Sequence, residues 1–182
     1  MTPTLIGYFV KQTERRAELV KALKVEELCS VSCCISKAPE GWIQRWLHNE
    51  LWLYDSEELA WRVLPEAQEA EDFELYAYRL FPLRYVDGQE QSLQIPTLKV
   101  QPLSASYERL GLDVVNRSQN NQFGCSPLSC NGRAIDFTVN RHCLLDELKA
   151  ARGLATLFSS GTHAAEPGPY HVVEVFRERQ TK

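Results

Sequence analysis

The order of β-prone and helical segments constrains the fold of this chain more than any other feature of the sequence. β-prone runs occupy residues 4–10, 73–85, 93–100, 112–116, 134–139 and 170–177. Helical patterns begin at residues 13, 55 and 145 and are interspersed irregularly among these runs. The regular strand–helix alternation of a parallel doubly wound sheet is absent. The sequence therefore predicts an α+β fold, with a mixed or mainly antiparallel sheet of about six strands and about three helices packed on it.

The chain length and charge limit the class of protein. Its 182 residues are enough for one domain with its own core, so we expect a single domain over residues 1–182. The net charge is −4 and the basic residues are scattered, which makes nucleic-acid binding unlikely on electrostatic grounds. No apolar run approaches the roughly 20 residues of a membrane span, and residues 1–10 resemble a strand more than a signal peptide. We expect a soluble, cytoplasmic protein whose six cysteines are reduced or metal-bound.

Local patterns predict several elements in detail. Asp55 or Ser56 can cap a helix that starts there, and Pro65 should kink or end it early. Asp87-Gly88 is a turn signal between the runs 73–85 and 93–100, which predicts a β-hairpin, and Pro82 should push part of it to an edge. All four tryptophans fall between residues 42 and 61, a concentration that is most simply core. Residues 25–36 fit a buried strand or an irregular core segment.

A polar stretch between residues 117 and 143 is the expected location of the function. Residues 117–133, RSQNNQFGCSPLSCNGR, have almost no apolar periodicity. A connection of about seventeen residues without secondary structure is unusual in a compact domain unless it is functional or tied to a ligand. Its polar and cationic side chains, together with the next arginine along the chain, are candidate ligand-binding residues: Arg117, Asn131 and Arg141.

The cysteines of this stretch allow several kinds of chemistry. Cys125 and Cys130 could bind zinc together with two other thiolates, drawn from Cys29, Cys33, Cys34 and Cys143. The alternative for those four is that they are small buried apolar residues. Cys125 or Cys130 could also be a nucleophile activated by nearby arginines and His142, or the two could form a disulfide. His163 and His171 are expected to be surface or core residues and not catalytic bases.

Four segments together resemble ADP-ribosyltransferase-like domains. They are GYF at 7–9, ELWLYDSEELA at 50–60, ELYAYRLFP at 74–82 and LGLDVVNRS at 110–118. The resemblance implies that Tyr54 and Ser56 lie beside a nicotinamide pocket and that Asp113 starts the strand leading to the active edge. It implies a nucleotide-binding protein with NAD as ligand, catalytically weakened because the family's catalytic histidine or arginine and its glutamate have no counterpart here. The alternative is that Tyr54 completes the core and Ser56 only caps its helix.

Two further functions stay open beside NAD binding. The chain could be a non-catalytic interaction protein, such as an inhibitor, an adaptor or a complex subunit. It would then present residues 117–133 and the segment EPGPY to a protein partner, with contacts from Phe123, Pro127, Glu166 and Tyr170. Exposed Phe123 and Pro127 would serve as the main contacts. The third possibility is a zinc-stabilised binding module built on Cys125 and Cys130.

Overall fold

The computed structural model describes residues 1–32, 34–64, 72–117, 121–161, 166 and 168–179. Cys33, Pro65 and His163, which carried predictions above, lie outside the described residues. Within these ranges, none of the helices combines the length and the apolar character that a membrane crossing requires.

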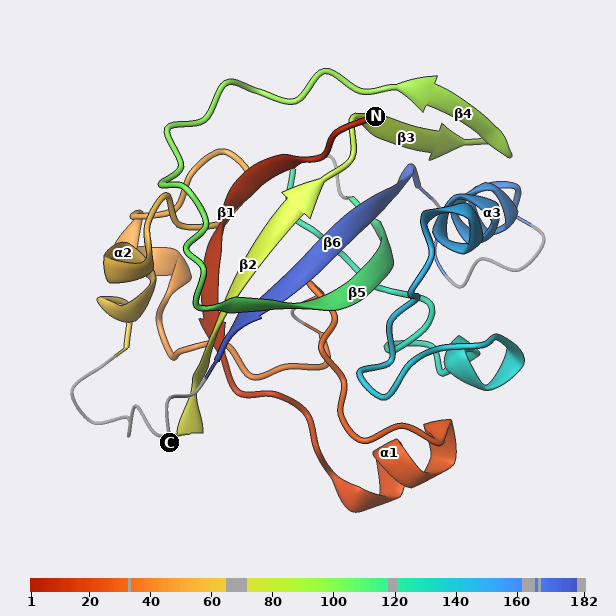
Figure 1. Cartoon of the computed structure of the whole chain (residues 1–182), viewed down its shortest axis with the longest axis horizontal. Helices are drawn as coiled ribbons and strands as arrows, with labels where there is room; N and C mark the ends of the chain where they lie inside the picture. Colours follow the sequence, from red (N-terminus) through yellow and green to blue (C-terminus); the bar gives the residue numbers. More distant parts are fainter. Residues whose placement is uncertain (33, 65–71, 118–120, 162–165, 167, 180–182) are drawn as a thin grey trace.

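One six-stranded sheet organises the described part of the chain, and all of its strand pairs are antiparallel (Figure 1). The strands are β1 (Thr4–Lys11), β2 (Glu74–Leu80), β3 (Leu83–Val86), β4 (Gln89–Ser92), β5 (Tyr107–Asn116) and β6 (Tyr170–Glu178). The helices are α1 (Ala17–Leu23), α2 (Glu57–Trp61) and α3 (Leu148–Ser159), with 3-10 turns η1 (Ile43–Arg45) and η3 (Arg133–Asp136). The predicted α+β class, with a mainly antiparallel sheet and about three helices, is confirmed.

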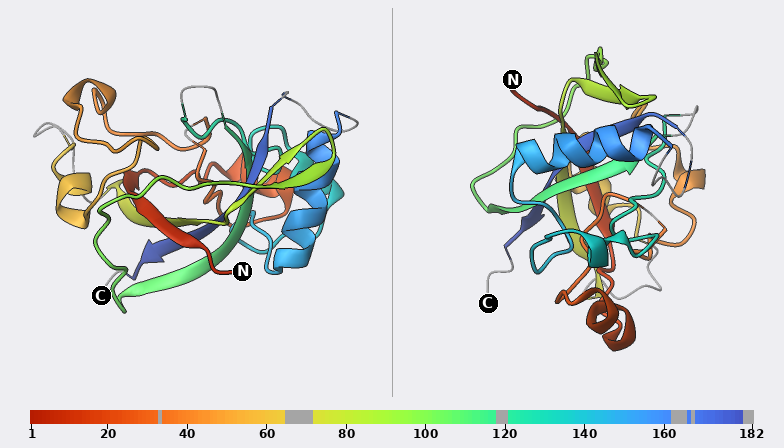
Figure 2. Two further views of the ribbon diagram at one scale, coloured as in Figure 1. Left: turned by 90° about the horizontal axis from the view of Figure 1, so that it is seen from above. Right: turned by 90° about the vertical axis from the view of Figure 1, so that its right-hand side faces the viewer.

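Strand β6, the last in the chain, lies in the middle of the sheet. It pairs with β5 on one side and with β2 on the other, and Tyr170 at its start also pairs with Tyr85 of β3. Val172 and Val173 are both fully buried but belong to different core clusters, because successive side chains of a strand point to opposite faces. The helix α3 packs on β5 and β6 on the Val172 face, as Figure 2 shows. Both faces of the central strands are therefore covered.

The predicted hairpin exists, but with a different second strand. Asp87 and Gly88 both have positive φ, 50° and 73°, which is the backbone of a tight two-residue turn, and they join β3 to β4. The second strand is therefore Gln89–Ser92, and the prediction of a strand at 93–100 is wrong. Leu93, Ile95 and neighbouring apolar residues pack on the core without joining the sheet. Pro82 lies in a break between β2 and β3, whereas the strand at this edge of the sheet is β4.

Two other sequence predictions are corrected. Residues 134–139 do not form a strand, and their first three residues belong instead to η3, which follows Gly132 with φ 68°. The backbone N–H groups of Arg133 and Ala134 donate to Pro127 and Leu128 of the preceding loop, so they are not available to a strand partner. Residues 25–32 and 34–36 form a largely buried irregular segment and not a strand, which matches the second alternative given for residues 25–36.

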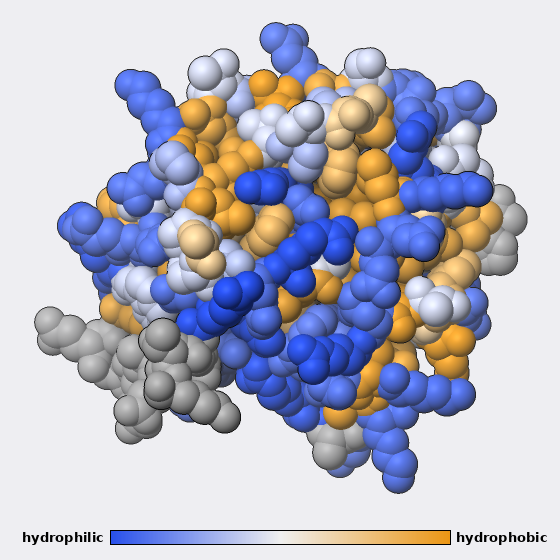
Figure 3. All heavy atoms as spheres, viewed as in Figure 1, coloured by the Kyte–Doolittle hydropathy of each residue, from blue (hydrophilic) through white to orange (hydrophobic). Residues whose placement is uncertain are grey.

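The tryptophans divide between core and surface. Trp42 is buried, Trp52 and Trp61 are partly buried, and Trp46 is 75% exposed. The prediction that all four belong to the core is therefore wrong for Trp46. On the face shown in Figure 3, apolar side chains occupy several areas that hydrophilic side chains separate.

Candidate functional site

Three cysteine thiols converge at one point of the structure. The sulfur atoms of Cys34, Cys125 and Cys130 all lie within 4.8 Å of one another. The Sγ atoms of Cys34 and Cys125 are 3.4 Å apart although the residues are 91 positions apart in the chain. We call these three residues the thiol cluster. The structure thus places a third thiol, that of Cys34, beside the predicted pair Cys125 and Cys130.

The loop after β5 is folded tightly enough to place its two cysteines. The N–H of Asn116 donates to the carbonyl of Cys125 at 3.0 Å, and the N–H of Gly124 donates to the carbonyl of Asn116 at 3.0 Å. The N–H of Cys130 donates to the carbonyl of Ser126 at 2.8 Å. A Cβ at position 124 would lie 2.2 Å from Asn116 Oδ1, so a larger residue there would displace the Asn116 side chain. These contacts fix the backbone on both sides of each thiol.

Asp113 connects the two segments that carry the thiol cluster. Its carboxylate is fully buried and accepts hydrogen bonds from Ser30 Oγ at 2.6 Å and from the Val31 N–H at 3.0 Å. It also accepts one from Ser126 Oγ at 2.7 Å. Burial raises the pKa of Asp113, and the hydrogen bonds from Ser126 and Ser30 act against that increase. Because Ser30 and Ser126 each lie four residues or fewer from a cluster thiol, Asp113 fixes the distance between the two segments.

The thiols crowd one another, and those of Cys125 and Cys130 are partly removed from water. Burial raises the pKa of Cys125, and hydrogen bonds to Glu166 and Cys34 raise it further. Burial also raises the pKa of Cys130, whose sulfur lies 3.2 Å from Ser32 Oγ. The nucleophile hypothesis for Cys125 and Cys130 therefore lacks the lowered pKa that it needs. A bound cation reverses this situation, because it favours the thiolate forms.

A second group of possible metal ligands, Glu27, Cys29 and His142, is a buried ion-pair cluster. His142 Nδ1 lies 2.6 Å from Glu27 Oε1, and Glu27 also pairs with Arg177 at 2.9 Å and with Arg15 at 2.8 Å. Burial alone would raise the pKa of Glu27, but hydrogen bonds from His142 and Arg177 hold it far below its usual range. Burial raises the pKa of Cys29 to about 12. The carboxylate is already neutralised by arginines, so this cluster is better suited to structural stabilisation than to metal binding.

The residues that the ADP-ribosyltransferase-like resemblance selected have structural contacts. Tyr54 is fully buried, and its backbone exchanges hydrogen bonds of 2.8 and 2.9 Å with Tyr8 of β1. Ser56 Oγ accepts from the Leu59 N–H at 3.2 Å and caps α2, as the alternative interpretation held. Asp113 lies inside β5 and does not start it. None of the three lies at an exposed surface, and NAD binding itself stays a prediction.

The other three candidate ligand residues do not form one site through their observed contacts. Arg117 donates to Asn121 Oδ1 at 2.7 Å, Arg141 lies 3.9 Å from Glu26, and Asn131 is exposed. In the described part of the chain, no hydrogen bond or ion pair joins Arg117, Asn131 and Arg141 to one another.

The four candidate partner residues are built into the fold. Phe123 is only 4% exposed and Pro127 is buried, so the prediction of exposed contact residues in the loop is wrong. The loop turns its apolar side chains inward, because they complete the core below it. Glu166 accepts from Asn116 Nδ2 at 3.1 Å, and the buried Tyr170 donates its hydroxyl to the Glu166 carbonyl at 2.8 Å.

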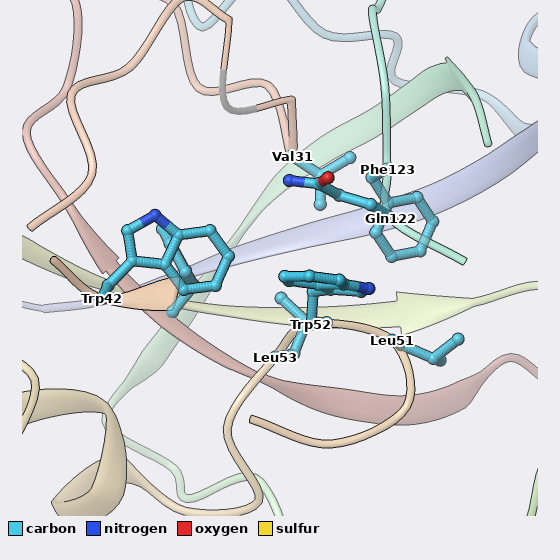
Figure 4. Close-up of a pocket in the computed structure, with 8 residues that line it drawn as sticks. Val31, Trp42, Leu51, Trp52, Leu53, Gln122 and Phe123 are labelled. Carbon is cyan, nitrogen blue, oxygen red and sulfur yellow. The ribbon is translucent and has the colours of Figure 1, made fainter. Parts of the chain in front are cut away.

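The inward-facing Phe123 forms one wall of a small aromatic pocket. Figure 4 shows Trp42 and Trp52 facing this pocket, with Val31 and Gln122 above Trp52 and Phe123 beside it. The rings of Trp42 and Trp52 are 6.1 Å apart and nearly perpendicular, at 78°. The cavity holds about 30 Å³, which is room for a group no larger than a methyl or a water molecule. The concentration of tryptophans in the sequence was the signal that could have located it.

A larger groove lies on the exposed side of the thiol cluster. Residues 12–16 form one side and residues 34–37 the other, and the Gln12 N–H donates to the Lys37 carbonyl at 2.9 Å between them. The groove is wide open to solvent, has a volume of about 640 Å³ and includes Cys34 in its lining. Sequence reasoning missed it, because no motif links the two segments.

No family model matches the chain, and no curated protein or solved structure matches it significantly.

Proposed function

We propose that this protein is a zinc-stabilised binding module in which Cys34, Cys125 and Cys130 bind one Zn²⁺ ion. The observation that carries the proposal is the convergence of three thiols from segments far apart in the chain. Thiolates bound to zinc at about 2.3 Å in a tetrahedron lie roughly 3.8 Å from one another. In the thiol cluster one pair of sulfur atoms is 3.4 Å apart and all pairs lie within 4.8 Å, which is compatible with that value. Small side-chain rotations would therefore suffice to bind the ion.

The chemistry of the cluster favours a soft divalent cation. Thiolates select zinc and similar metals over magnesium or calcium, which prefer oxygen ligands. Glu166 hydrogen-bonds to the Cys125 thiol, so its carboxylate is the candidate for the fourth ligand. Asn116 donates to the Glu166 carboxylate and would orient it, as residues behind a metal ligand commonly do.

The ion would hold the loop after β5 against the buried segment before Cys34. These segments supply Val31, Gln122 and Phe123 to the aromatic pocket, and the second segment continues into the groove. A metal at the thiol cluster would thus support two concave surfaces at once. The binding role of the module is assigned to these surfaces, and the role of the metal is to keep them in place.

Metal analysis of protein purified without chelator tests the proposal. We expect about one zinc per chain, lost in Cys125→Ala and Cys130→Ala and retained in the control Cys143→Ala, because Cys143 is a buried free thiol outside the cluster. Replacement of zinc by Co²⁺ should produce thiolate charge-transfer absorption in the wild type and in the control only. Chelation should lower the midpoint of thermal unfolding, since a ligand at 100 times its Kd stabilises by about 2.7 kcal/mol. Metal-free wild-type protein, or a disulfide joining Cys34 to Cys125 in its native state, would contradict the proposal.

A second candidate function is a protein interaction, and one observation favours it. Trp46 is 75% exposed beside the partly exposed Ile43 and Leu47. Exposed tryptophans are frequent at the centre of protein interfaces. Affinity capture from the native host, with wild-type protein and with Trp46→Ala side by side, tests this candidate. A partner captured equally by both proteins, or by neither, would count against a role for this surface.

A further inference from the structure

The three residues of the thiol cluster differ in their access to solvent. Cys34 is exposed and lies in the lining of the open groove, so small solutes can reach its side chain. Cys125 and Cys130 are both partly buried. Redox-sensing cysteines combine solvent access with a second thiol close by, which reacts with the oxidised form of the first. Cys34 is therefore the thiol of the cluster that meets a dissolved oxidant first.

Cys125 supplies the neighbouring thiol. Its Sγ lies 3.4 Å from the Sγ of Cys34, and a disulfide requires an approach to about 2.0 Å. The backbone of Gly124 and Cys125 is held by hydrogen bonds with the backbone of Asn116, so the approach falls to the two cysteine side chains. The sulfur of Cys130 has a different contact, with the Ser32 hydroxyl at 3.2 Å. The geometry thus selects Cys34 and Cys125 as the pair.

A disulfide in this pair and a metal ion in the thiol cluster exclude each other. Zinc is bound by thiolates, and a sulfur atom in a disulfide is no longer a thiolate. With Cys34 and Cys125 joined, Cys130 and Glu166 would be the candidate ligands that remain. Two ligands fall short of the four that a structural zinc site has. The same two sulfur atoms therefore serve one state or the other.

We propose that the thiol cluster is a redox switch, in which a hydroperoxide joins Cys34 to Cys125 by a disulfide and the zinc ion is released. Cys34 Sγ takes one oxygen atom from the peroxide and becomes a sulfenic acid, while the rest of the peroxide leaves as water or an alcohol. Cys125 Sγ then attacks Cys34 Sγ, the S–S bond forms, and the sulfenic oxygen leaves as water. The two thiols lose two electrons and two protons in total, and the peroxide takes up all of them.

The release of metal rests on the proposed zinc site, whereas the disulfide depends only on Cys34 and Cys125. Both states join the loop after β5 to the buried segment before Cys34, the metal through three sulfur atoms and the disulfide through two. Oxidation therefore empties the metal site and keeps the two segments connected. A thiol reductant restores the cluster, because disulfide formation is reversible.

Treatment of the native protein with hydrogen peroxide tests the proposal through two measurements on each sample. The dye 4-(2-pyridylazo)resorcinol measures the zinc set free, and mass spectrometry of an unreduced tryptic digest detects the disulfide. Cleavage by trypsin places Cys34 in the peptide 25–37 and Cys125 in the peptide 118–133. We expect about one zinc per chain to be released together with a cross-link between these peptides. Dithiothreitol should remove the cross-link.

Four variants assign the cross-link to its cysteines. It should be absent from Cys34→Ala and from Cys125→Ala. Cys130→Ala should form it although this variant holds no zinc, because both sulfur atoms of the pair remain. Cys143→Ala is the matched control and should behave like the wild type, since Cys143 is buried and lies outside the cluster.

The outcomes separate this inference from the proposed function. Zinc that stays bound in the wild type, with no cross-link after oxidation, would overturn the inference and leave the zinc site standing. A cross-link as abundant in Cys34→Ala or Cys125→Ala as in the wild type would overturn it as well. Wild-type protein that holds no zinc before oxidation would contradict the proposed function, and with it the release of metal.

Discussion

Replacement of His171 by phenylalanine should make the stability of this protein less sensitive to mild acid. His171 lies in β6 with 2% exposure, and its Nδ1 is buried without a hydrogen-bond partner among the described residues. Burial first, and then the charges of Arg117 and Arg84, lower the pKa of His171 from 6.5 to about 4. A hydrogen bond with the Leu83 backbone acts in the opposite direction but is outweighed.

The size and sign of the effect follow from these two pKa values. In the unfolded chain the imidazole takes up a proton near pH 6.5, whereas in the folded protein it does so only near pH 4. Between these values the unfolded state binds more protons, so the free energy of unfolding decreases as the pH falls from 6.5 to 4 and is unaffected by this group above that window. At about 1.4 kcal/mol per pKa unit, the loss amounts to roughly 3 kcal/mol.

Urea denaturation between pH 7.5 and pH 4.5, followed by circular dichroism, measures this dependence. Phenylalanine keeps a ring of similar size in a buried site but cannot titrate. The free energy of unfolding of His171→Phe should therefore change less with pH than that of the wild type, whatever its absolute value at pH 7.5. Identical slopes for both proteins between pH 6.5 and 4.5 would refute the burial argument.

Three further substitutions have expected effects that urea denaturation can measure. Glu27→Gln should cost about 3 kcal/mol at pH 7, because it removes the carboxylate at 2.9 Å from Arg177 and leaves that arginine with Glu74 and Glu108 at 3.6 and 3.5 Å. It should also reduce the loss of wild-type stability below pH 4.5, because the folded-state pKa of Glu27 is lowered. Asp113→Ala should destabilise the protein by about 3 kcal/mol, because three buried donors lose their acceptor at roughly 1 kcal/mol each. The same substitution should reduce zinc retention. Unchanged stability would exclude the role of Asp113 in connecting the two segments. Gly111→Ala should destabilise the protein by at least about 2 kcal/mol, because the φ angle of residue 111 is 148° and the new Cβ would lie 2.8 Å from Leu144 Cβ. Unchanged stability would contradict this argument from backbone strain.

Sequence reasoning predicted well the elements that depend only on residues close by in the sequence. The Ser56 cap of α2 and the Asp87-Gly88 turn are determined within a few residues, and both are present. The strand at 134–139 was wrong, although its composition is β-prone. The N–H of Ala134, its first residue, donates to Leu128, and a contact of that kind is decided by the path of a loop and not by residue type.

The candidate site was predictable only in part, because its geometry is tertiary. Cys125 and Cys130 were identified as a pair from their position in a polar stretch, yet Cys34 comes from a segment 91 residues away from Cys125. Nothing in the local sequence selects Cys34 over Cys29 or Cys143 as the third thiol. The choice follows from Asp113, whose hydrogen bonds bring the two segments together.

The order of the loop at 117–133 needs a different explanation from the one that its composition suggested. A long connection without apolar periodicity was expected to be held by something that binds to it. In the described residues of this loop, Phe123 and Leu128 reach the core, and the Ser126 hydroxyl donates to Asp113. The backbone of Asn116 forms hydrogen bonds with the backbones of Gly124 and Cys125. Its shape is therefore supported from within, and order alone is no argument for a ligand at the loop. The argument for function rests instead on the thiol cluster, three adjacent thiols that the fold brings together from distant segments.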